Sequence, residues 1–408
     1  MKENKTKPDI RLKGFIDDWE QRKLGEVLET VTDYVAAGSF ADLAKNVEYK
    51  DFPDYAQLVR TMDLKNGFTS IQEVYVNKSA FDYLYRVNMD KECIILPNIG
   101  NCGEVYYVKP EYLPYEHNVL GPNAIFVRSE TNANKFLSIL FQAKDFQTKL
   151  KLIVSPNGQT KFNKTELKRI DLILPANISE QQKIGDYFQS IDHLITLHQR
   201  ECDQLKELKK TMLKKMFPRD GSNIPEVRFA GFTDDWEQRK LGDMGSTFTG
   251  LSGKTKEDFG HGDAQFITYM NVFSNPVANL EMTEAVEIDA KQNCVKKGDV
   301  FFTTSSETPE EVGMSCVMPE NKDNIYLNSF CFGYRPTEKF DLDYLAYVLR
   351  ADSFRKEMTF LAQGISRYNI SKNKVMEVSI PIPNLEEQTK IGQYFSQLDN
   401  LITLHQRL

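Results

Sequence analysis

The feature that most constrains this chain is an internal duplication. Residues 17–25, DDWEQRKLG, are identical to residues 234–242, and residues 194–200, LITLHQR, are identical to residues 401–407. Two long identities in the same order are not a chance event in a chain of 408 residues. The chain is therefore expected to fold as two copies of one unit.

Each copy ends in a segment that predicts a long helix. In residues 179–217, apolar side chains recur three and four positions apart, and Gly185 is the only glycine or proline, a pattern typical of a coiled-coil seam. Ser179 and Gln182 suggest a capping box at its start, and Pro218 suggests its end. Such a helix would be about 57 Å long, too long to be buried in one ordinary domain. Residues 385–408 repeat the pattern.

Two helices that each carry an apolar face would most economically pack on each other. The pattern leaves their direction open. We expect an antiparallel pair, because it would relate the two copies by a pseudo-twofold axis. The first helix continues past Arg200 to residue 217, whereas the second stops at Leu408. The pair is thus expected to be asymmetric, or the chain to be shortened at its end.

Between these anchors each copy is expected to be a mixture of short strands and helices. Residues 297–303 resemble residues 91–97, and both predict a strand; residues 136–146 and 344–354 predict one amphipathic helix each. The fold class is α+β, with two similar globular domains separated by long helices that pair as an antiparallel coiled coil. The expected boundaries are 1–177 for the first globular domain, 178–217 for the first long helix, 218–383 for the second globular domain and 384–408 for the shorter second helix.

Composition excludes several classes of protein. No stretch approaches eighteen apolar residues and the N-terminus lacks the apolar core of a signal peptide, so a cytoplasmic protein with no membrane contact is expected. The six cysteines form no CxxC pair, which argues against a zinc site or a disulfide framework. The net charge of −7 argues against binding nucleic acid by bulk electrostatics alone, but leaves room for local basic loops.

The duplication itself suggests a function. Two modules of one fold, with divergent surfaces and paired rigid helices between them, would hold two binding surfaces at a fixed distance. The ligand of such a protein should be extended and carry two recognition elements at a fixed spacing. Duplex DNA fits, because half-sites about 34–36 Å apart present the same groove one turn on.

Together these segments resemble a known family. The repeated WEQRKLG, the GDV-FFT strand and loop, the segments at residues 158–163 and 364–369 (GQTKFN and GISRYN), the EEQ-KI helix start and the LHQR interior resemble the specificity subunit of a type I restriction-modification system. The resemblance covers nearly the whole chain, in the family's order.

The resemblance implies a subunit with no catalytic activity of its own. Each target recognition domain would read one half of a split double-stranded DNA site, and the helices would set the spacer. They would also dock two modification subunits, which bring S-adenosylmethionine and methylate adenine. Two restriction subunits would add translocation and cleavage driven by ATP with Mg. No cofactor is expected in this chain.

Catalytic alternatives fail on spacing. GLSGKT at residues 250–255 ends like a phosphate loop, but the first glycine of that motif is replaced by Phe248. No Asp/Asn-Pro-Pro-aromatic segment occurs, and five scattered histidines form no metal or catalytic constellation. His198 and His405, at equivalent positions of the two helices, either fix the pairing register or have a pH-sensing or ligand role.

Candidate DNA contacts lie on loops at equivalent places in the two copies. Arg and Lys can hold phosphate or read guanine, Asn can pair with adenine, and small hydroxyls can contact either. For each segment an ordinary turn that packs within the module remains the alternative. The candidates are Arg60, Thr61, Asn98, Asn101, Lys161 and Asn163 in the first copy, and Thr268, Tyr269, Thr303, Thr304, Ser305, Ser306, Arg367, Tyr368 and Asn369 in the second.

Other conspicuous residues favour structural roles. The basic run at residues 206–215 is interpreted as a solvated helix face, with contact to spacer DNA or a partner as the alternative. Trp19 and Trp236 are interpreted as scaffold or docking residues rather than base-stacking ones. Two rival functions remain: a non-DNA two-module coiled-coil adaptor, and the detached recognition part of a single-chain restriction-methylation enzyme.

Overall fold

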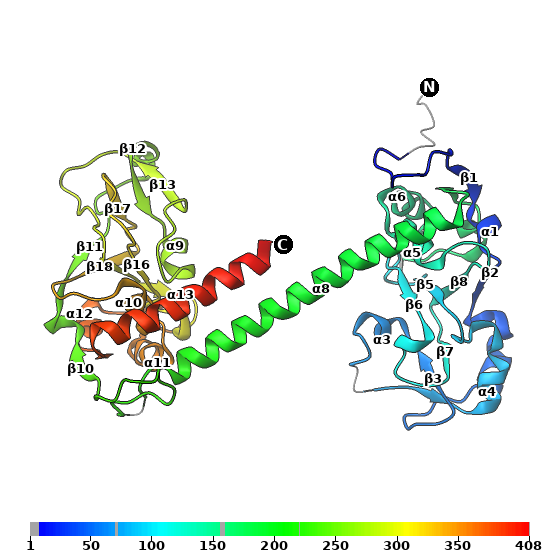
Figure 1. Ribbon diagram of the computed structural model, residues 1–408, viewed down its shortest axis with the longest axis horizontal. Coiled ribbons are helices and arrows are strands. Elements are labelled where there is room, and N and C mark those ends of the chain that lie inside the picture. The colour runs from blue at the N-terminus through cyan, green and yellow to red at the C-terminus, as the bar shows by residue number, and fades with distance from the viewer. Residues whose placement is uncertain (1–7, 70–71, 156–159, 220, 408) are drawn as a thin grey trace. The chain divides into compact units, whose positions relative to one another are not determined.

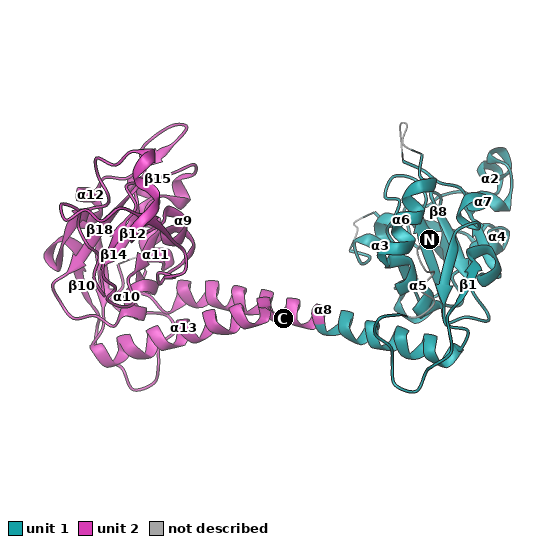
Figure 2. Ribbon diagram, turned by 90° about the horizontal axis from the view of Figure 1, so that it is seen from above, with its two compact units in different colours: residues 1–194 teal, residues 195–408 magenta. Residues whose placement is uncertain are grey.

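The structure, a computed structural model, describes residues 8–69, 72–155, 160–219 and 221–407. The chain forms two compact units, Met1–Leu194 and Ile195–Leu408, each a mixture of helices and strands (Figures 1 and 2). The boundary between them falls inside the longest helix, α8 (Ile178–Lys215). The expected α+β class is confirmed.

Unit 1 is built on two sheets and a separate strand pair. The larger sheet is antiparallel with the order β2-β8-β5-β6; the smaller has the order β4-β3-β7, with β3 and β7 parallel; β1 pairs with β9. The strands are β1 (Glu20–Lys23), β2 (Thr30–Asp33), β3 (Ala56–Val59), β4 (Tyr75–Val76), β5 (Cys93–Pro97), β6 (Tyr106–Val108), β7 (Asn118–Leu120), β8 (Ala124–Arg128) and β9 (Asp171–Leu174). The helices are α1 (Leu24–Val27), α2 (Phe40–Asn46), α3 (Thr61–Lys65), α4 (Lys78–Tyr83), α5 (Asn134–Gln142), α6 (Lys144–Ile153) and α7 (Lys164–Leu167), with 3-10 turns η1 (Tyr34–Ala37), η2 (Tyr85–Val87) and η3 (Pro110–Tyr112).

Unit 2 repeats the two sheets and the strand pair of unit 1 and adds one further pair. Its sheets have the orders β11-β18-β14-β16 and β13-β12-β17, β10 pairs with β20, and a further pair joins β15 to β19. The strands are β10 (Glu237–Lys240), β11 (Gly245–Thr249), β12 (Phe259–Ile267), β13 (Thr283–Val286), β14 (Val300–Thr303), β15 (Ser305–Ser306), β16 (Ser315–Val317), β17 (Ile325–Leu327), β18 (Cys331–Pro336), β19 (Tyr368–Asn369) and β20 (Ser379–Ile382). The helices are α9 (Tyr269–Ser274), α10 (Leu342–Val348), α11 (Asp352–Leu361), α12 (Lys372–Met376) and α13 (Leu385–Arg407), with 3-10 turns η4 (Leu241–Asp243), η5 (Lys256–Asp258) and η6 (Pro309–Glu311). The internal repeat is thus present in the fold as well as in the sequence.

The single amphipathic helix expected in each copy is in fact two. Ala143 separates α5 from α6 and Ala351 precedes α11, and both residues have extended backbone angles. The break lets the chain turn so that both helices bury apolar side chains. In unit 1 the rings of Phe141 and Phe146 stack with their centroids 4.6 Å apart. Heptad-type periodicity cannot reveal such a break, because alanine is a good helix former.

The identical WEQRKLG segments and the residues before them attach the start of each long helix to its own unit. Arg11 donates two hydrogen bonds of 2.7 Å to the Glu180 carboxylate, and Arg228 donates two of 2.7 and 2.9 Å to Glu387. Both carboxylates are buried, and these hydrogen bonds raise the pKa of each arginine. Trp19 also donates to Glu180 through Nε1, at 3.3 Å.

A second attachment uses the glutamine that follows each glutamate. Gln181 accepts from the Ala133 amide at 3.0 Å and donates to the Pro175 carbonyl at 2.8 Å. Gln388 likewise accepts from the Asp341 amide at 3.1 Å and donates to the Pro383 carbonyl at 2.9 Å. We call the arginine-glutamate fork and this glutamine together the clasp. The hydrogen bond from Trp19 to Glu180 joins the first identical segment to the clasp and supports a scaffold role for Trp19.

The capping box expected at Ser179 and Gln182 is wrong. Helix α8 begins one residue earlier, at Ile178, and the Asn177 side chain accepts from the Ser179 amide at 2.9 Å. In unit 2 the Asn384 side chain accepts from the Glu387 amide at the same distance, 2.9 Å. An asparagine cap satisfies one of the free amide groups of the first turn just as well.

Helix α13 packs antiparallel on the part of α8 that belongs to unit 2 (Figure 2). Along α8, Cys202 lies against Ile402, whereas Lys209 forms an ion pair of 2.5 Å with Asp399. Phe217, just beyond the end of α8, stacks on Phe395 with centroids 5.8 Å apart. Because positions rise on one helix as they fall on the other, the expected antiparallel pairing is confirmed.

The repeated helix faces are covered unequally. In α13 the seam residues Ile391, Phe395, Leu398 and Ile402 are all buried. Of their counterparts in the first copy, Ile184 and Ile191 are half-buried, whereas Phe188 is 43% and Ile195 55% exposed. Within the described residues the first copy has no segment equivalent to residues 202–217 on this face, so identical side chains meet two different environments.

Among the described residues, no helix combines the length and the apolar character that a membrane span requires.

Candidate nucleic-acid interface

Two of the segments singled out in the second copy come together at one end of the central strand β14. After Thr303 the chain forms β15, and Ser305 and Ser306 pair antiparallel with Asn369 and Tyr368 of β19. The Ile370 amide donates to the Thr304 carbonyl at 3.0 Å and extends the pairing. The loop after the core strand and the segment at residues 364–369 thus form one surface.

Helix α9 brings a third segment to the same surface. Thr268 caps this helix, because its hydroxyl accepts from the Asn271 amide at 3.2 Å. The Tyr269 hydroxyl donates to the Ser305 carbonyl at 2.7 Å, and burial raises the pKa of Tyr269, so the phenol stays neutral. The amide and the hydroxyl of Thr304 both donate to the Phe330 carbonyl.

An open cavity of about 290 Å³ lies between these segments. It presents aromatic and apolar surface beside both signs of charge. Phe330 is 59% exposed and Met270 55%, and neither was singled out from the sequence. The sequence offers one signal that such a side chain is exposed: it stands next to a buried residue, as Phe330 stands before Cys331. The lining residues are Tyr269, Met270, Phe273, Ser306, Glu307, Glu311, Phe330 and Arg367.

The hydroxyl-rich loop faces inward more than expected. Thr303 is fully buried, and its hydroxyl accepts from the Met314 amide at 3.0 Å. Ser305 and Ser306 are also buried, and the Ser306 hydroxyl donates to the Thr308 carbonyl. These hydroxyls position the loop, so direct contact with a ligand falls to their exposed neighbours.

Two partly buried arginines fix the position of this surface. Arg350 donates to the carbonyls of Val272, Phe273 and Asn275 at the end of α9, and to that of Ser315. Burial lowers the pKa of Arg350 to about 10, which leaves it charged at neutral pH.

The second of these arginines, Arg355, holds the loop that follows β15. It donates to the carbonyls of Glu310, Val312 and Gly313 at distances of 2.6–2.8 Å. In unit 1 the equivalent side chain, Gln147, donates to the Gly103 carbonyl at 2.8 Å. Gly103 and Gly313 both have positive φ, 110° and 63°, a backbone conformation that favours glycine.

Unit 1 builds the corresponding surface from different residues. The Asn98 carbonyl accepts from the Phe162 amide, and the Asn98 side chain donates to the Phe162 carbonyl, at 3.1 and 3.2 Å. Ile99 and Lys161 form a bridge. The loop after β5 therefore meets the segment at residues 160–163 as β15 meets β19. Gly158 lies outside the described residues.

Arg60 has a local partner. Its guanidinium contacts both carboxylate oxygens of the buried Asp63, at 2.9 and 2.7 Å, at the start of α3. Thr61 is the first residue of that helix. Lys65 at the end of α3 pairs with Glu104 at 2.6 Å, which joins α3 to the loop that contains the exposed Asn101. Within unit 1 the Arg60 charge is therefore largely neutralised.

The remaining polar candidates differ in whether their side chains are already engaged within their own unit. Asn163 caps α7, since its side chain accepts from the Glu166 amide at 2.9 Å. By contrast, Lys161 and Arg367 are exposed at equivalent positions. No hydrogen bond or ion pair engages either cationic head among residues 8–69, 72–155, 160–219 and 221–407. Asn369 is exposed beside Arg367.

The basic run of α8 is partly neutralised within unit 2. Lys209 pairs with Asp399 at 2.5 Å and Lys215 with Glu226 at 2.7 Å. Lys210 and Lys214 are exposed. These contacts favour the interpretation of the run as a solvated and ion-paired helix face.

Comparisons with known proteins agree with the repeat. A family model described as the type I restriction modification DNA specificity domain matches residues 16–207 and again residues 233–408. The putative type I restriction enzyme MjaX specificity subunit of Methanocaldococcus jannaschii is 24% identical over 420 residues, covering 96% of this chain and 89% of that protein. The MjaVIII specificity subunit of the same organism is 22% identical over 403 residues, covering 96% and 88%.

Solved structures show the same fold. The S subunit of a type I restriction-modification system from M. genitalium matches with a TM-score of 0.53 and 12% identity, covering 98% of this chain and 94% of that chain. A chain from a study of complex assembly and conformational transition in a type I restriction-modification system matches with a TM-score of 0.52 and 15% identity, covering 95% and 92%. Since the family model accounts for both copies of the duplicated unit, the chain belongs to the type I restriction-modification DNA specificity family.

Proposed function

We propose that each unit reads one half of a bipartite DNA target and that α8 and α13 set the unread spacer and dock two modification subunits. The complex would methylate adenine in the two halves and, with two restriction subunits, cleave unmodified DNA in the cytoplasm. S-adenosylmethionine, ATP and Mg would be bound by those partners. The chain itself would contribute no catalytic group.

One observation carries this proposal. Each unit presents an exposed cation, Lys161 or Arg367, on the segment that pairs with the loop after its central strand. The scaffold beneath is repeated, whereas the surrounding surface differs. A shared cation that holds phosphate, surrounded by divergent side chains that read bases, is the division of labour expected of sequence-specific DNA recognition.

The acidic and aromatic lining in unit 2 suits base edges better than phosphates. The Glu307 and Glu311 carboxylates can accept a hydrogen bond from cytosine N4, and Phe330 can contact a thymine methyl group. The same carboxylates would repel an approaching phosphate unless Arg367 compensates. This arrangement favours readout of a base by unit 2 over purely electrostatic binding.

The function is tested by single-molecule methylome sequencing of a methylation-free host that expresses this chain with its cognate modification subunit. We expect a split motif with methyladenine in both halves. Exchanging residues 218–383 for those of a relative should change one half only. Omission of the chain is the control. A methylation pattern that does not depend on the chain would refute DNA specificity and favour the adaptor alternative; a motif that needs no separate modification subunit would favour the single-chain enzyme.

Replacing Arg367 with alanine is expected to lower the slope of log K against log salt by about one, because the guanidinium is proposed to hold a phosphate. A loss of about 1–3 kcal/mol that depends on one base of the identified target would instead assign Arg367 to base readout. Fluorescence anisotropy over a salt series, on the complex with the modification subunit, distinguishes the two.

Lys339→Ala is the matched control for that variant. Lys339 is exposed and follows the far end of β18, whereas Phe330 precedes its near end. The two variants change the net charge equally. Equal losses of affinity in both would show that Arg367 acts only through overall charge.

A further inference from the structure

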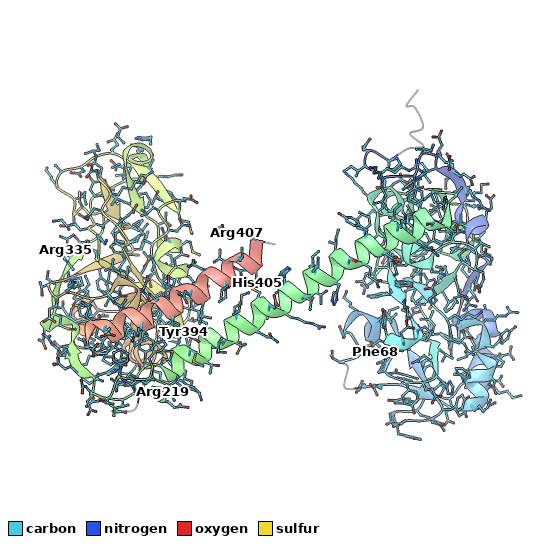
Figure 3. All side chains as sticks on the ribbon, in the orientation of Figure 1. Phe68, Arg219, Arg335, Tyr394, His405 and Arg407 are labelled. Atoms are coloured by element: carbon cyan, nitrogen blue, oxygen red, sulfur yellow. The ribbon has the colours of Figure 1, made fainter. Side chains whose placement is uncertain are left out.

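The helix pair of unit 2 contains a cluster of ligand atoms that the DNA function does not use. His198 and His405 occupy equivalent positions of the repeat, 207 residues apart, and their Nδ1 atoms lie 3.1 Å from each other. A Glu201 carboxylate oxygen lies 3.3 Å from Nδ1 of His405 and 3.6 Å from Nδ1 of His198. Figure 3 shows His405 near the end of α13.

The three atoms converge on a common point. A charge-assisted hydrogen bond between a carboxylate and a nitrogen spans about 2.7–2.9 Å, and both distances from Glu201 are longer than this. The carboxylate therefore faces the two rings without pairing closely with either. Two neutral imidazoles can share one hydrogen bond between their Nδ1 atoms, which leaves the carboxylate without a hydrogen-bond donor from either Nδ1.

The spacing fits a metal ion. Ligand atoms about 2.0–2.1 Å from a tetrahedral Zn²⁺ lie about 3.3 Å apart from one another. The three separations found here are 3.1, 3.3 and 3.6 Å. Two imidazoles and one carboxylate suit zinc and neighbouring divalent transition metals, and a fourth position would remain for water.

We propose that His198, Glu201 and His405 bind a divalent transition metal ion such as Zn²⁺, which joins the last turn of α13 to α8. Two of the three ligands come from the internal repeat, because the two histidines are repeat equivalents. Glu201 breaks the symmetry of the repeat. The proposal does not rest on DNA recognition, since metal binding is measured on the chain alone.

Spacing along the sequence hides such a site. Two of its ligands are three residues apart and the third comes from the other copy, so no metal-binding motif is formed. The sequence therefore predicts no metal site, and the proposal replaces that prediction. The antiparallel register of α8 and α13 is what creates the cluster.

The test is titration of the chelator-treated full-length chain with Co²⁺ followed by visible absorption, and with Zn²⁺ by calorimetry. We expect one equivalent of tight binding. His198→Ala and His405→Ala should each weaken it by at least 100-fold, and Glu201→Gln by about 10-fold. The cobalt spectrum should lack the intense near-ultraviolet band of a thiolate ligand, because Cys202 is buried in the seam.

Matched controls lie on the same helix. His193→Ala and Glu207→Gln remove an exposed histidine and an exposed glutamate and should leave the affinity unchanged. Glu201 is itself 54% exposed, so its variant should fold even if a histidine variant does not; circular dichroism checks this.

A second readout concerns the helix itself. Zn²⁺, added at a concentration that saturates only the unmodified chain, should slow amide hydrogen exchange in the last turns of α13 there and leave it unchanged in His198→Ala. Failure to bind an equivalent of either metal, or binding that survives all three substitutions, would overturn the proposal.

Discussion

Replacing Phe395 with alanine is expected to lower the free energy of unfolding of unit 2 by about 3–5 kcal/mol. The ring is fully buried, stacks on Phe217 and lies 5.1 Å from the ring of Tyr347. Its removal leaves a cavity where α8, α10 and α13 meet. The same substitution at the repeat-equivalent Phe188, which is 43% exposed, should cost less than about 1 kcal/mol, because little apolar surface is removed from contact.

The chain provides its own reporters for this experiment. It has two tryptophans, Trp19 in unit 1 and Trp236 in unit 2, so single-tryptophan variants report the unfolding of each unit in denaturant. The ring of Trp236 lies 6.4 Å from that of Phe217 and should sense the cavity. Equal losses from the two phenylalanine substitutions would contradict the unequal covering of the repeated helix faces.

Replacing Arg350 with methionine should destabilise unit 2 by about 3 kcal/mol. A buried group left without its hydrogen-bond partner costs about 1–3 kcal/mol, and Arg350 donates to four main-chain carbonyls. Three of these belong to α9 and the residue after it, so the helix that carries Tyr269 should shift. In the methylation assay the half-site read by unit 2 should become degenerate, while the other half stays unchanged.

Gln142→Met is the matched control, at the equivalent position of unit 1. The Gln142 side chain is exposed, and the hydrogen bond that it makes lies within its own helix, to the Ser138 carbonyl at 3.2 Å. We expect a change of less than about 0.5 kcal/mol. If Arg350→Met unfolds unit 2 entirely, Arg350→Lys serves instead, since it keeps the charge but reaches fewer carbonyls. A stable Arg350→Met variant with an unaltered motif would refute the positioning role.

Repetition and periodicity predicted the architecture of this chain well. The strand β14 and the loop after it, the long helix α8 and its pairing with α13 all follow from residue pattern, because burial of one apolar face determines them. The antiparallel direction of the pair does not follow from the pattern; it is expected because it would relate the two copies by a pseudo-twofold axis. The helix break at Ala143 does not follow from the pattern, because alanine favours helix. The cap at Asn177 does not follow either, because several types of residue can cap a helix.

Site prediction was weaker for a specific reason. The residue types of the loops predicted which segments meet, but the direction of each side chain decides which residues can contact a ligand. Thr303 and Arg60 have the right chemistry, yet one points into the core and the other is held by Asp63. Phe330 and Met270 look like ordinary core residues in sequence and lie exposed. Such differences depend on the packing of three elements at once.

The clasp has a mechanical consequence. In each unit an arginine fork and a glutamine fasten different sides of the first helical turn, so the helix cannot swivel about its axis without breaking several bonds together. Each joint is therefore stiff, and it is the same joint in both units. A unit with a new surface could replace an old one and still leave its helix in the same direction. The clasp therefore allows the DNA-binding surface of a unit to vary while the attachment of that unit to its long helix stays the same.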